Sequence, residues 1–294
     1  MSQKNVSRSV LPITICWAAL VAPVYAQHFE NVKGDIASVS AGRNEVFGVD
    51  NHAAVWRYHS TTQSFRKIAG ASLSQVAVGG GTVSQLDEVW GLDASSNVYR
   101  FNYDTEAFDQ IPGASLTQIT VGEGDQDDCH PYEIWGVNSG ESIFRYDYCA
   151  NTFNQSSGLL IRVVTGGGDV WGLNSVGSVF HYDFGTQTFG QVSGPLTEIA
   201  VGVNDVWGIN SSHEVFRYDS NSGEFVKVAG ILAQIAAGGN GAWGINPASG
   251  IFRFDSSSES WAQVPGLLTS ISVGSGAGVF GVNSSDHVYT FVRP

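Results

Sequence analysis

One short pattern recurs seven times along this chain and constrains its fold more than any other feature. Each copy is an aromatic residue, a glycine, an aliphatic residue and an asparagine or aspartate, and successive aromatic residues lie 43, 45, 36, 36, 36 and 37 positions apart. A near-constant period of this length is typical of repeated supersecondary units. The copies, which define repeats 1 to 7, are Phe47–Asp50, Trp90–Asp93, Trp135–Asn138, Trp171–Asn174, Trp207–Asn210, Trp243–Asn246 and Phe280–Asn283.

Repeat 5 shows what one unit contains. Four β-rich runs, at 199–202, 205–210, 215–219 and 225–230, are separated by segments rich in Asn, Ser and Gly, which favour turns. Long helical periodicity is absent. Four short strands in one repeat predict an antiparallel meander, which is the sheet of one propeller blade. The sequence therefore predicts an all-β, seven-bladed β-propeller of four-stranded antiparallel blades.

The two ends of the chain predict how this ring closes. Phe29–Gly34 matches a fourth strand, whereas Val288–Val292 is a third strand with no fourth strand after it. We expect the N-terminal strand to complete the last blade, because closure removes the exposed sheet edge of an open array.

Repeats 2 and 3 are longer than the others for a local reason. Their loops between the first two strands, Gly80–Glu88 and Glu123–Glu133, carry insertions. Equivalent loops of a propeller lie on one face, and variable surface loops often carry function.

Residues 1–26 have the pattern of a secretion signal peptide. Lys4 and Arg8 precede an apolar run from 11 to 22, and Val24-Tyr25-Ala26 fits a cleavage site. The apolar run is too short to predict a membrane span. We expect a secreted, extracellular protein whose single domain occupies residues 27–294.

The charge balance excludes one class of partner. Fourteen basic residues against 27 acidic residues give a formal net charge of −13. Nucleic-acid binding requires clustered Lys and Arg, so a general nucleic-acid binder is not expected. Docking on anionic lipid is disfavoured as well, and no membrane insertion is predicted.

Two cysteines remain after removal of the leader. Cys16 lies within the apolar run, which leaves Cys129 and Cys149 in an oxidising compartment. We predict a disulfide between them; two unpaired thiols are the alternative.

Arginine recurs at one position of the third strand. His181 and Thr290 replace it in two repeats. In one interpretation the guanidinium is buried and bonds to loop carbonyls or to a neighbouring acid such as Asp219. In the other it presents a fork of donors to sugar or phosphate oxygens. The recurrent arginines are Arg57, Arg100, Arg145, Arg217 and Arg253.

The residues of the recurrent pattern also have two interpretations each. The tryptophans either pack between blades or stack on a sugar through an exposed edge. The asparagines either cap turns by bonding to local backbone or bind sugar hydroxyls. The candidate sugar-binding set therefore adds Trp90, Trp135, Trp171, Trp207, Trp243, Asn138, Asn174, Asn210 and Asn246.

No enzyme signature is present in the sequence. Nucleophile elbows, HExxH motifs and P-loops are absent, and the histidines lack metal-ligand spacing. Residues 125–128 (Asp-Gln-Asp-Asp) could offer oxygens to Ca²⁺, but we interpret them as an ordinary solvated acidic loop. We predict a protein that is not an enzyme and has neither cofactor nor metal.

The repeat resembles the tectonin repeat. The resemblance rests on the strands of Ile199–Gly230, namely IAVG, VWGIN, VFRYD and a closing VAG, and it extends over nearly all of 29–294. Phe replaces Trp in the first and last repeats. The resemblance implies a β-propeller lectin of innate defence that recognises glycans of microbial surfaces, including lipopolysaccharide and O-methylated sugars.

Two functions are consistent with these observations. The first is a secreted, non-catalytic, multivalent lectin in which weak sites around the ring gain avidity on a dense glycan surface. The second is an extracellular protein-interaction scaffold that displays the inserted loops of repeats 2 and 3 to one partner.

Overall fold

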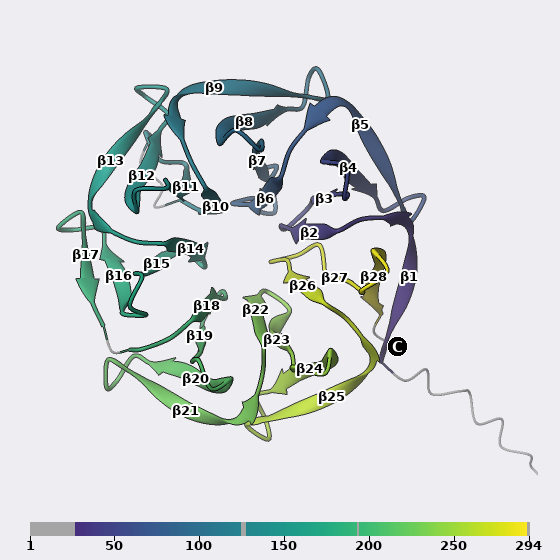
Figure 1. Cartoon of the computed structure of the whole chain (residues 1–294), viewed down its shortest axis with the longest axis vertical. Coiled ribbons are helices and arrows are strands. Elements are labelled where there is room, and N and C mark those ends of the chain that lie inside the picture. Colours follow the sequence, from purple (N-terminus) through teal and green to yellow (C-terminus); the bar gives the residue numbers. More distant parts are fainter. Residues whose placement is uncertain (1–26, 125–127, 193, 293–294) are drawn as a thin grey trace, which may run out of the picture.

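The strands of this protein are arranged as a ring of sheets around a central axis (Figure 1). The computed structural model describes residues 27–124, 128–192 and 194–292. These residues form 28 strands, β1 to β28, and no helix. Accordingly, they contain no helix with the length and apolar character of a membrane span. The predicted signal peptide, 1–26, lies outside the described residues.

Each repeat forms its strands in chain order. Repeats 1 to 3 contain β2 (Ser38–Ala41), β3 (Val46–Val49), β4 (Ala54–His59), β5 (Ser64–Ser72), β6 (Gln75–Gly79), β7 (Glu88–Leu92), β8 (Asn97–Asn102), β9 (Ala107–Ser115), β10 (Gln118–Glu123), β11 (Tyr132–Val137), β12 (Ser142–Asp147) and β13 (Thr152–Leu159).

The remaining repeats continue the same order. They contain β14 (Arg162–Gly166), β15 (Asp169–Leu173), β16 (Val179–Asp183), β17 (Thr188–Gln191), β18 (Glu198–Val201), β19 (Val206–Ile209), β20 (Glu214–Asp219), β21 (Glu224–Ile231), β22 (Gln234–Gly238), β23 (Gly241–Ile245), β24 (Gly250–Asp255), β25 (Ser260–Leu267), β26 (Ser270–Val273), β27 (Val279–Val282) and β28 (His287–Val292), and the N-terminal strand is β1 (His28–Asp35).

The described strands pair into five four-stranded sheets and one eight-stranded sheet. The larger sheet has the order β2-β3-β4-β5-β1-β28-β27-β26. Within it, β1 pairs antiparallel with β28, from His28 opposite Val292 onward, as the chain ends predict. The junction of β1 with β5 is a single parallel bridge between Lys33 and Ser64. The N-terminal strand therefore joins the two ends of the chain.

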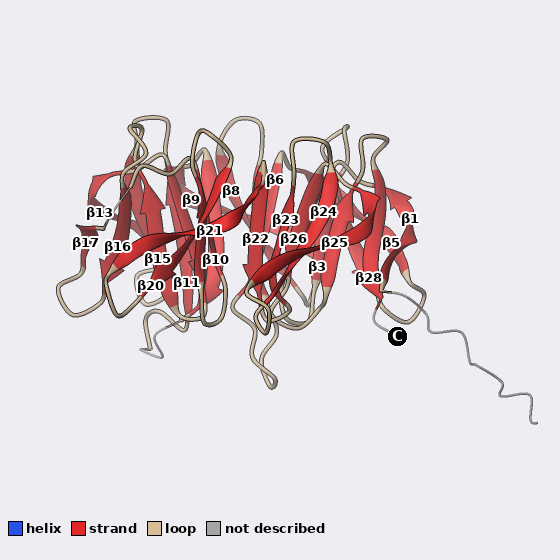
Figure 2. Cartoon of the chain, turned by 90° about the horizontal axis from the view of Figure 1, so that it is seen from below, coloured by secondary structure: helices blue, strands red, loops and turns tan. Residues whose placement is uncertain are grey.

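The antiparallel meander gives the disc two distinct faces, with loops at both edges of the strands (Figure 2). We call the face with the loops between first and second strands, and between third and fourth strands, the insertion face. The opposite face carries the turns between second and third strands, and we call it the Asx face. In repeat 3 the inserted loop is shorter than predicted, because Glu123 pairs with Tyr132 and lengthens the hairpin.

The recurrent glycine is explained by close packing against a leucine or isoleucine. A Cβ built on Gly208 would overlap Leu196 Cδ1, and one on Gly48 would overlap Ile36 Cγ2. All seven glycines of the pattern have such a partner, taken from the segment that leads into the first strand of the same repeat. The partners are Ile36, Leu73, Leu116, Leu160, Leu196, Leu232 and Leu268.

Aromatic rings join each repeat to the next. Trp207 of repeat 5 meets Phe254 of repeat 6 edge-on, with 4.6 Å between ring centroids. The equivalent contact between Phe280 and Tyr58, at 5.1 Å, joins the last repeat to the first. Such edge-to-face pairs contribute beyond the apolar area that they bury. They hold the sheets together around the whole ring.

Side chains at the start of the first strands add polar bonds between neighbouring sheets. The amide of Gln118 donates to Val163 O at 2.9 Å and accepts from Val163 N at 3.0 Å. Glu198 occupies the same position in repeat 5, where its carboxylate accepts from Ile235 N at 3.1 Å. A carboxylate has no donor for the carbonyl, so it replaces only half of the glutamine's interaction.

Replacement of Gly208 by alanine tests the packing of the recurrent glycine. We expect Gly208→Ala to lower the free energy of unfolding by about 1–3 kcal/mol, because the added methyl group overpacks against Leu196. Urea denaturation measures the change. Gly190→Ala is the matched control, because a Cβ there would meet only His181 O at 3.9 Å. Equal effects of the two substitutions would contradict the explanation.

The partly buried carboxyl of Glu198 predicts a pH dependence of stability. Burial raises its pKa, and the charge of Arg162 only partly opposes this. The folded chain therefore holds the proton more tightly than the unfolded chain, and the free energy of unfolding falls as pH rises from about 4.3 through the raised value. Glu198→Gln removes that decline and adds a hydrogen bond worth about 1 kcal/mol. Denaturation curves between pH 4 and 8 test this; an unchanged pH profile would contradict it.

Candidate functional site

Three of the recurrent arginines form ion pairs with glutamates that lie at the start of the second strand or directly before it. Arg100 donates from Nε to Glu88 Oε2 at 2.8 Å and from Nη2 to Glu88 Oε1 at 2.5 Å. Arg57 makes the same two bonds to Glu45 at 2.8 and 2.6 Å. Arg145 is held in this way by Glu133, which is fully buried. Bidentate, charge-assisted bonds of this kind fix a guanidinium firmly.

These ion pairs shift the titration of the arginines. The hydrogen bond to Glu45 raises the pKa of Arg57, although burial opposes it. Burial lowers the pKa of Arg100, but the bonds and charge of Glu88 outweigh it, and the net shift is upward. Both guanidinium groups therefore remain charged and paired in the folded protein.

An aromatic ring from the next repeat covers each of these three arginines. Tyr103 lies 5.5 Å from Arg57 Cζ, and Tyr148 lies 5.2 Å from Arg100 Cζ. Phe184 covers Arg145 at 5.6 Å. The covering ring comes three residues after the arginine position of its own repeat. An acid on one side and a ring on the other hold each guanidinium in place, although the exposed fraction of the side chain rises from 10% at Arg145 to 36% at Arg100.

Arg217 in repeat 5 is held differently. Its guanidinium lies 5.4 Å from the Trp207 ring and 6.0 Å from the Phe254 ring. The position equivalent to Glu88, which we call the partner position, holds Asp205 in this repeat. Aspartate is one methylene shorter than glutamate, and Asp205 forms no ion pair with Arg217 within 4 Å. No other described residue bonds to this guanidinium, and Ser256 stands where the covering ring would be.

The other repeats vary the same position. In repeat 4, His181 stacks on Trp171 and lies 3.2 Å from Asp169. In repeat 6, Arg253 lies over the ring of Trp243, with glycine at the partner position. Thr290 of repeat 7 bonds to the backbone of Val279. The arginine position therefore differs in its side chain and its bonding partner from one repeat to the next.

All seven Asx residues of the recurrent pattern cap the turn between second and third strands. Asn138 Oδ1, for example, accepts from Gly140 N at 3.0 Å and from Ser142 N at 2.9 Å. The residue before the second donor has a positive φ in every turn, such as 63° at Glu141. This is the turn-capping interpretation of the asparagines. The caps are Asp50, Asp93, Asn138, Asn174, Asn210, Asn246 and Asn283.

The five tryptophans of the pattern are buried, with 0 to 1% of their surface exposed. A ring without an exposed face offers no platform on which a sugar can stack. Their position is that of packing residues, with no ring face exposed for stacking on a sugar. The rings concerned are Trp90, Trp135, Trp171, Trp207 and Trp243.

The structure does not bring the arginines and the asparagines together. Arg100 pairs with Glu88, at the end of β7 nearer the insertion face, whereas Asp93 follows the other end of that strand. The arginine position thus faces one side of the disc and the Asx cap the other. One ligand-binding site cannot combine both sets, so the two faces must be considered separately.

Equivalent grooves open beside the arginine position in two repeats. The groove of repeat 5 encloses about 480 Å³ and is lined by Arg217–Ser220, Val226, Val228 and Phe254, among others. The groove of repeat 2 encloses about 350 Å³ and is lined by the equivalent Arg100–Tyr103 together with Glu88. Each groove offers both charged and apolar surface.

A second pair of equivalent grooves lies on the Asx face. One encloses about 510 Å³ beside the junction of β1 with β5. Its lining includes Trp56, Asp50, His52 and Lys33 of β1. The other encloses about 310 Å³ beside Tyr99 and Asp93. Trp56 is only partly buried, and its Nε1 donates to Asp50 Oδ2 at 3.0 Å. This tryptophan therefore presents part of its surface next to polar groups.

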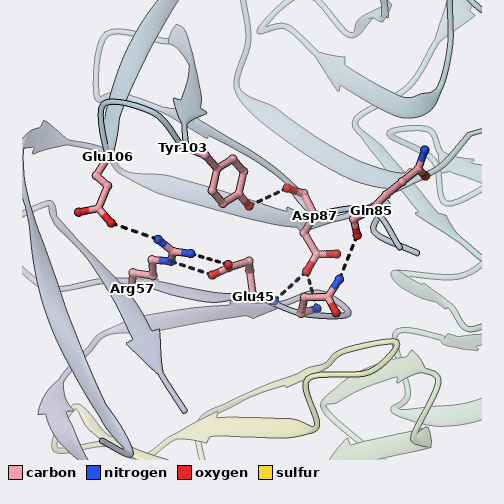
Figure 3. A network of polar contacts seen from close by, with 7 residues as sticks. Glu45, Arg57, Gln85, Asp87, Tyr103 and Glu106 are labelled. Carbon is pink, nitrogen blue, oxygen red and sulfur yellow. Dashed lines mark hydrogen bonds and ion pairs between the residues drawn. The ribbon is translucent and has the colours of Figure 1, made fainter. Parts of the chain in front are cut away.

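The inserted loop of repeat 2 is anchored by one buried carboxylate (Figure 3). Asp87 Oδ2 accepts from the backbone N–H groups of Asn44 at 2.6 Å and Glu45 at 2.8 Å. Its Oδ1 accepts from those of Arg43 and Gly81 at 3.1 and 3.0 Å. The loop is thus attached to repeat 1 beside the Arg57–Glu45 pair.

The inserted loop of repeat 3 is anchored covalently. Cys129 and Cys149 form the predicted disulfide, which joins this loop to the turn between β12 and β13. Of the acidic segment 125–128, residues 125–127 lie outside the described residues, so the calcium question concerns a part of the chain that is not described.

The family model for the tectonin domain matches residues 24–188 and 160–293, which together span nearly the whole described chain. The chain belongs to the tectonin family. No curated protein matches the sequence of this tectonin protein closely enough to count as a relative.

Solved structures with the same fold have little sequence in common with this tectonin protein. Yeast RCC1 (Prp20), solved with Kap60, has a TM-score of 0.65 at 10% identity, covering 88% of this chain and 80% of its own. YCF48, solved with a D1 peptide, has a TM-score of 0.64 at 12% identity, covering 93% and 97%. Human WBSCR16 has a TM-score of 0.65 at 10% identity, covering 89% and 88%. These similarities establish a propeller-like fold alone.

Sequence reasoning missed the acids that hold the arginines. Glu45, Glu88 and Glu133 lie two residues before the aromatic residue of the recurrent pattern, and an acid occupies this position in five of the seven repeats. That recurrence was the available signal. Trp56 was missed as well, although it is the only tryptophan that directly precedes a recurrent arginine.

The anchoring role of Asp87 predicts a large effect of removing its charge. Asp87→Asn keeps the size of the side chain but leaves one carbonyl oxygen for four backbone donors, so we expect a loss of about 1.5–3 kcal/mol in the free energy of unfolding. Limited proteolysis would then cut within 80–87 more readily. Asp104→Asn, at an exposed acid of the same repeat, is the control and leaves both readouts unchanged. A loop equally resistant in both variants would contradict the anchoring role.

Proposed function

We propose that this tectonin protein is a secreted, non-catalytic, multivalent lectin that binds glycans of microbial surfaces. O-methylated sugars and lipopolysaccharide are the first ligands to test. The observation that carries the proposal is the recurrence of grooves at equivalent positions, at Arg100 and Arg217 on one face and at Tyr99 and Trp56 on the other. Membership of the tectonin family supports it.

We also propose that the ring consists of seven four-stranded blades. The division of the eight-stranded sheet at the single Lys33–Ser64 bridge leaves two sheets of four strands, each with one copy of the recurrent pattern. Seven similar blades offer groove positions all around the disc. The differences among their side chains then decide which positions bind.

The chemistry of the grooves suits sugars better than purely apolar ligands. Arg100 and Asp109 line one groove together with Ile111, and Trp56 lies beside Asp50 and Lys33 in another. Sugar rings present hydroxyls at their edges and C–H groups on their faces, and an aromatic ring with nearby polar groups matches both. A methyl substituent on a sugar oxygen would add apolar contact of the same kind.

Weak single sites are sufficient for such a function. When several grooves face one surface, binding at the first makes later binding events intramolecular, and overall avidity rises steeply. The grooves at Arg100 and Arg217 lie at equivalent positions of their repeats and therefore on the same face of the disc. A dense microbial glycan layer would therefore be bound far more tightly than a free monosaccharide.

A glycan array tests the proposal directly. We expect binding to bacterial or fungal glycans, stronger for O-methylated sugars than for their unmethylated counterparts, and at least about 100-fold stronger on dense than on sparse surfaces. Calorimetry with a monovalent glycan should then give more than one site per chain. No binding across bacterial and fungal glycans would refute the proposal.

One observation supports a second function, that of a protein-interaction scaffold. The inserted loop of repeat 2 exposes two apolar side chains, with 87% of Val83 and 54% of Leu86 accessible. A scaffold would bind one partner per chain, and Val83→Ser with Leu86→Ser would abolish that binding. The same change would leave glycan binding unaffected, so the experiment distinguishes the two functions.

A further inference from the structure

We infer that the groove at Arg217 binds a sugar that carries a carboxylate, and that this carboxylate takes the position held by a glutamate side chain in repeats 1 to 3. The inference rests on the proposed glycan binding and names the ligand class of one groove. It follows from what the equivalent arginines of this chain do elsewhere in the ring.

Repeat 2 shows how the arginine position receives a carboxylate. Glu88 Oε2 accepts from Trp90 Nε1 at 2.9 Å and from Arg100 Nε at 2.8 Å, and Oε1 accepts from Arg100 Nη2 at 2.5 Å. Repeat 3 repeats the arrangement, with Trp135 Nε1 donating to Glu133 at 2.5 Å. An indole N–H and a guanidinium fork therefore form one set of donors that matches the two oxygens of a carboxylate.

Repeat 5 keeps these donors but has a shorter acid. Trp207 is fully buried, and its Nε1 has no hydrogen-bond partner among the described residues. The guanidinium of Arg217 likewise forms no hydrogen bond or ion pair with them. Asp205 lacks the methylene that lets Glu88 reach both donors. A buried donor without an acceptor costs free energy, which an incoming carboxylate would recover.

The groove gives a ligand access to the guanidinium of Arg217, which is part of its lining. In repeat 2 both Glu88 and Arg100 line the groove of about 350 Å³. The carboxylate that pairs with the arginine therefore lies in the wall of the groove. In repeat 5 the groove is larger, at about 480 Å³. Ser256 stands at the position of the covering ring. The guanidinium of Arg217 therefore lacks the cover that Tyr148 gives Arg100.

The walls of the groove suit the body of a sugar. Val226 lies directly opposite Arg217 across the strands and is 51% exposed, and Val228 and Phe254 continue the apolar surface. A pyranose ring could place its C–H face on these side chains while its carboxylate reaches the arginine. A ligand without an apolar face would leave this surface exposed to water.

The charges around the groove favour a carboxylate over a phosphate. Lys227 is paired with Glu214 at 2.6 Å, and Asp219 caps its own turn through Asn221 N. Arg217 is thus the lining cation without an ion pair to a described residue. Glu259 also lines the groove. Its negative charge repels a doubly charged phosphate more strongly than a singly charged carboxylate.

Titration with three matched ligands tests the inference. Methyl β-D-glucuronide, methyl β-D-glucoside and glucose 6-phosphate are added to the full mature chain, and binding is followed by calorimetry and by the Nε–H NMR signal of Arg217. We expect the glucuronide to bind at one site, at least about 10-fold more tightly than the glucoside, with an affinity that falls as salt rises. Equal affinity of the two glycosides, or tighter binding of the phosphate, overturns the inference.

Asp205→Glu is the decisive variant, because it leaves Arg217 in place. The added methylene should allow the acid to pair with Arg217, so glucuronide affinity should fall at least about 10-fold while the Tm holds or rises. Ser256→Tyr, which adds a covering ring, should weaken binding independently. Arg66→Gln, at an exposed arginine of β5, removes a positive charge outside the groove and is the control that leaves affinity unchanged. Wild-type affinity in both Asp205→Glu and Ser256→Tyr overturns the inference.

Failure of this inference is distinguishable from failure of the proposed function. If the array detects neutral glycans that bind Asp205→Glu as well as the wild type, the lectin proposal stands and the assignment of the carboxylate is wrong. If glucuronide binds as described but no microbial glycan does, the groove is correctly assigned and the lectin proposal fails.

Discussion

The ring of sheets depends on one contact, an edge-to-face pair of aromatic rings, made seven times. In each case a buried ring of the second strand meets a ring of the third strand in the next repeat, as with Trp207 and Phe254. The recurrent glycine beside that ring admits a leucine or isoleucine into the same layer. No sheet buries its own aromatic ring without its neighbour, so the stability of each repeat depends on the next.

The fold could be predicted from the sequence because its determinants are local and periodic. Turn-forming segments and alternating strands predict each four-stranded unit, and the missing fourth strand after Val288–Val292 predicts the pairing of β1 with β28. The disulfide followed from the even number of remaining cysteines. The length of the hairpin in repeat 3 could not be predicted, because the pairing of Glu123 with Tyr132 depends on cross-strand bonds inside an irregular insertion.

The candidate site was less predictable, because the same residue type has different surroundings in each repeat. The arginine position was evident, but its partner lies 12 residues earlier in the chain and becomes adjacent only through strand register, as for Arg100 and Glu88. Whether an arginine is paired with an acid and covered by a ring then depends on one methylene and one aromatic side chain. Asp205 and Ser256 make that difference at Arg217, and neither residue attracts attention by itself in the sequence.

The pairing of β1 with β28 has a consequence for biogenesis. Among the described strands β1 leaves the ribosome first and its partner β28 leaves last, with His28 opposite Val292. β28 must be synthesised before that pairing can form, so closure of the ring waits for the last described strand and has a high contact order. Until then β1 is an unsatisfied edge, and a chaperone that shields extended segments would be most useful at this stage.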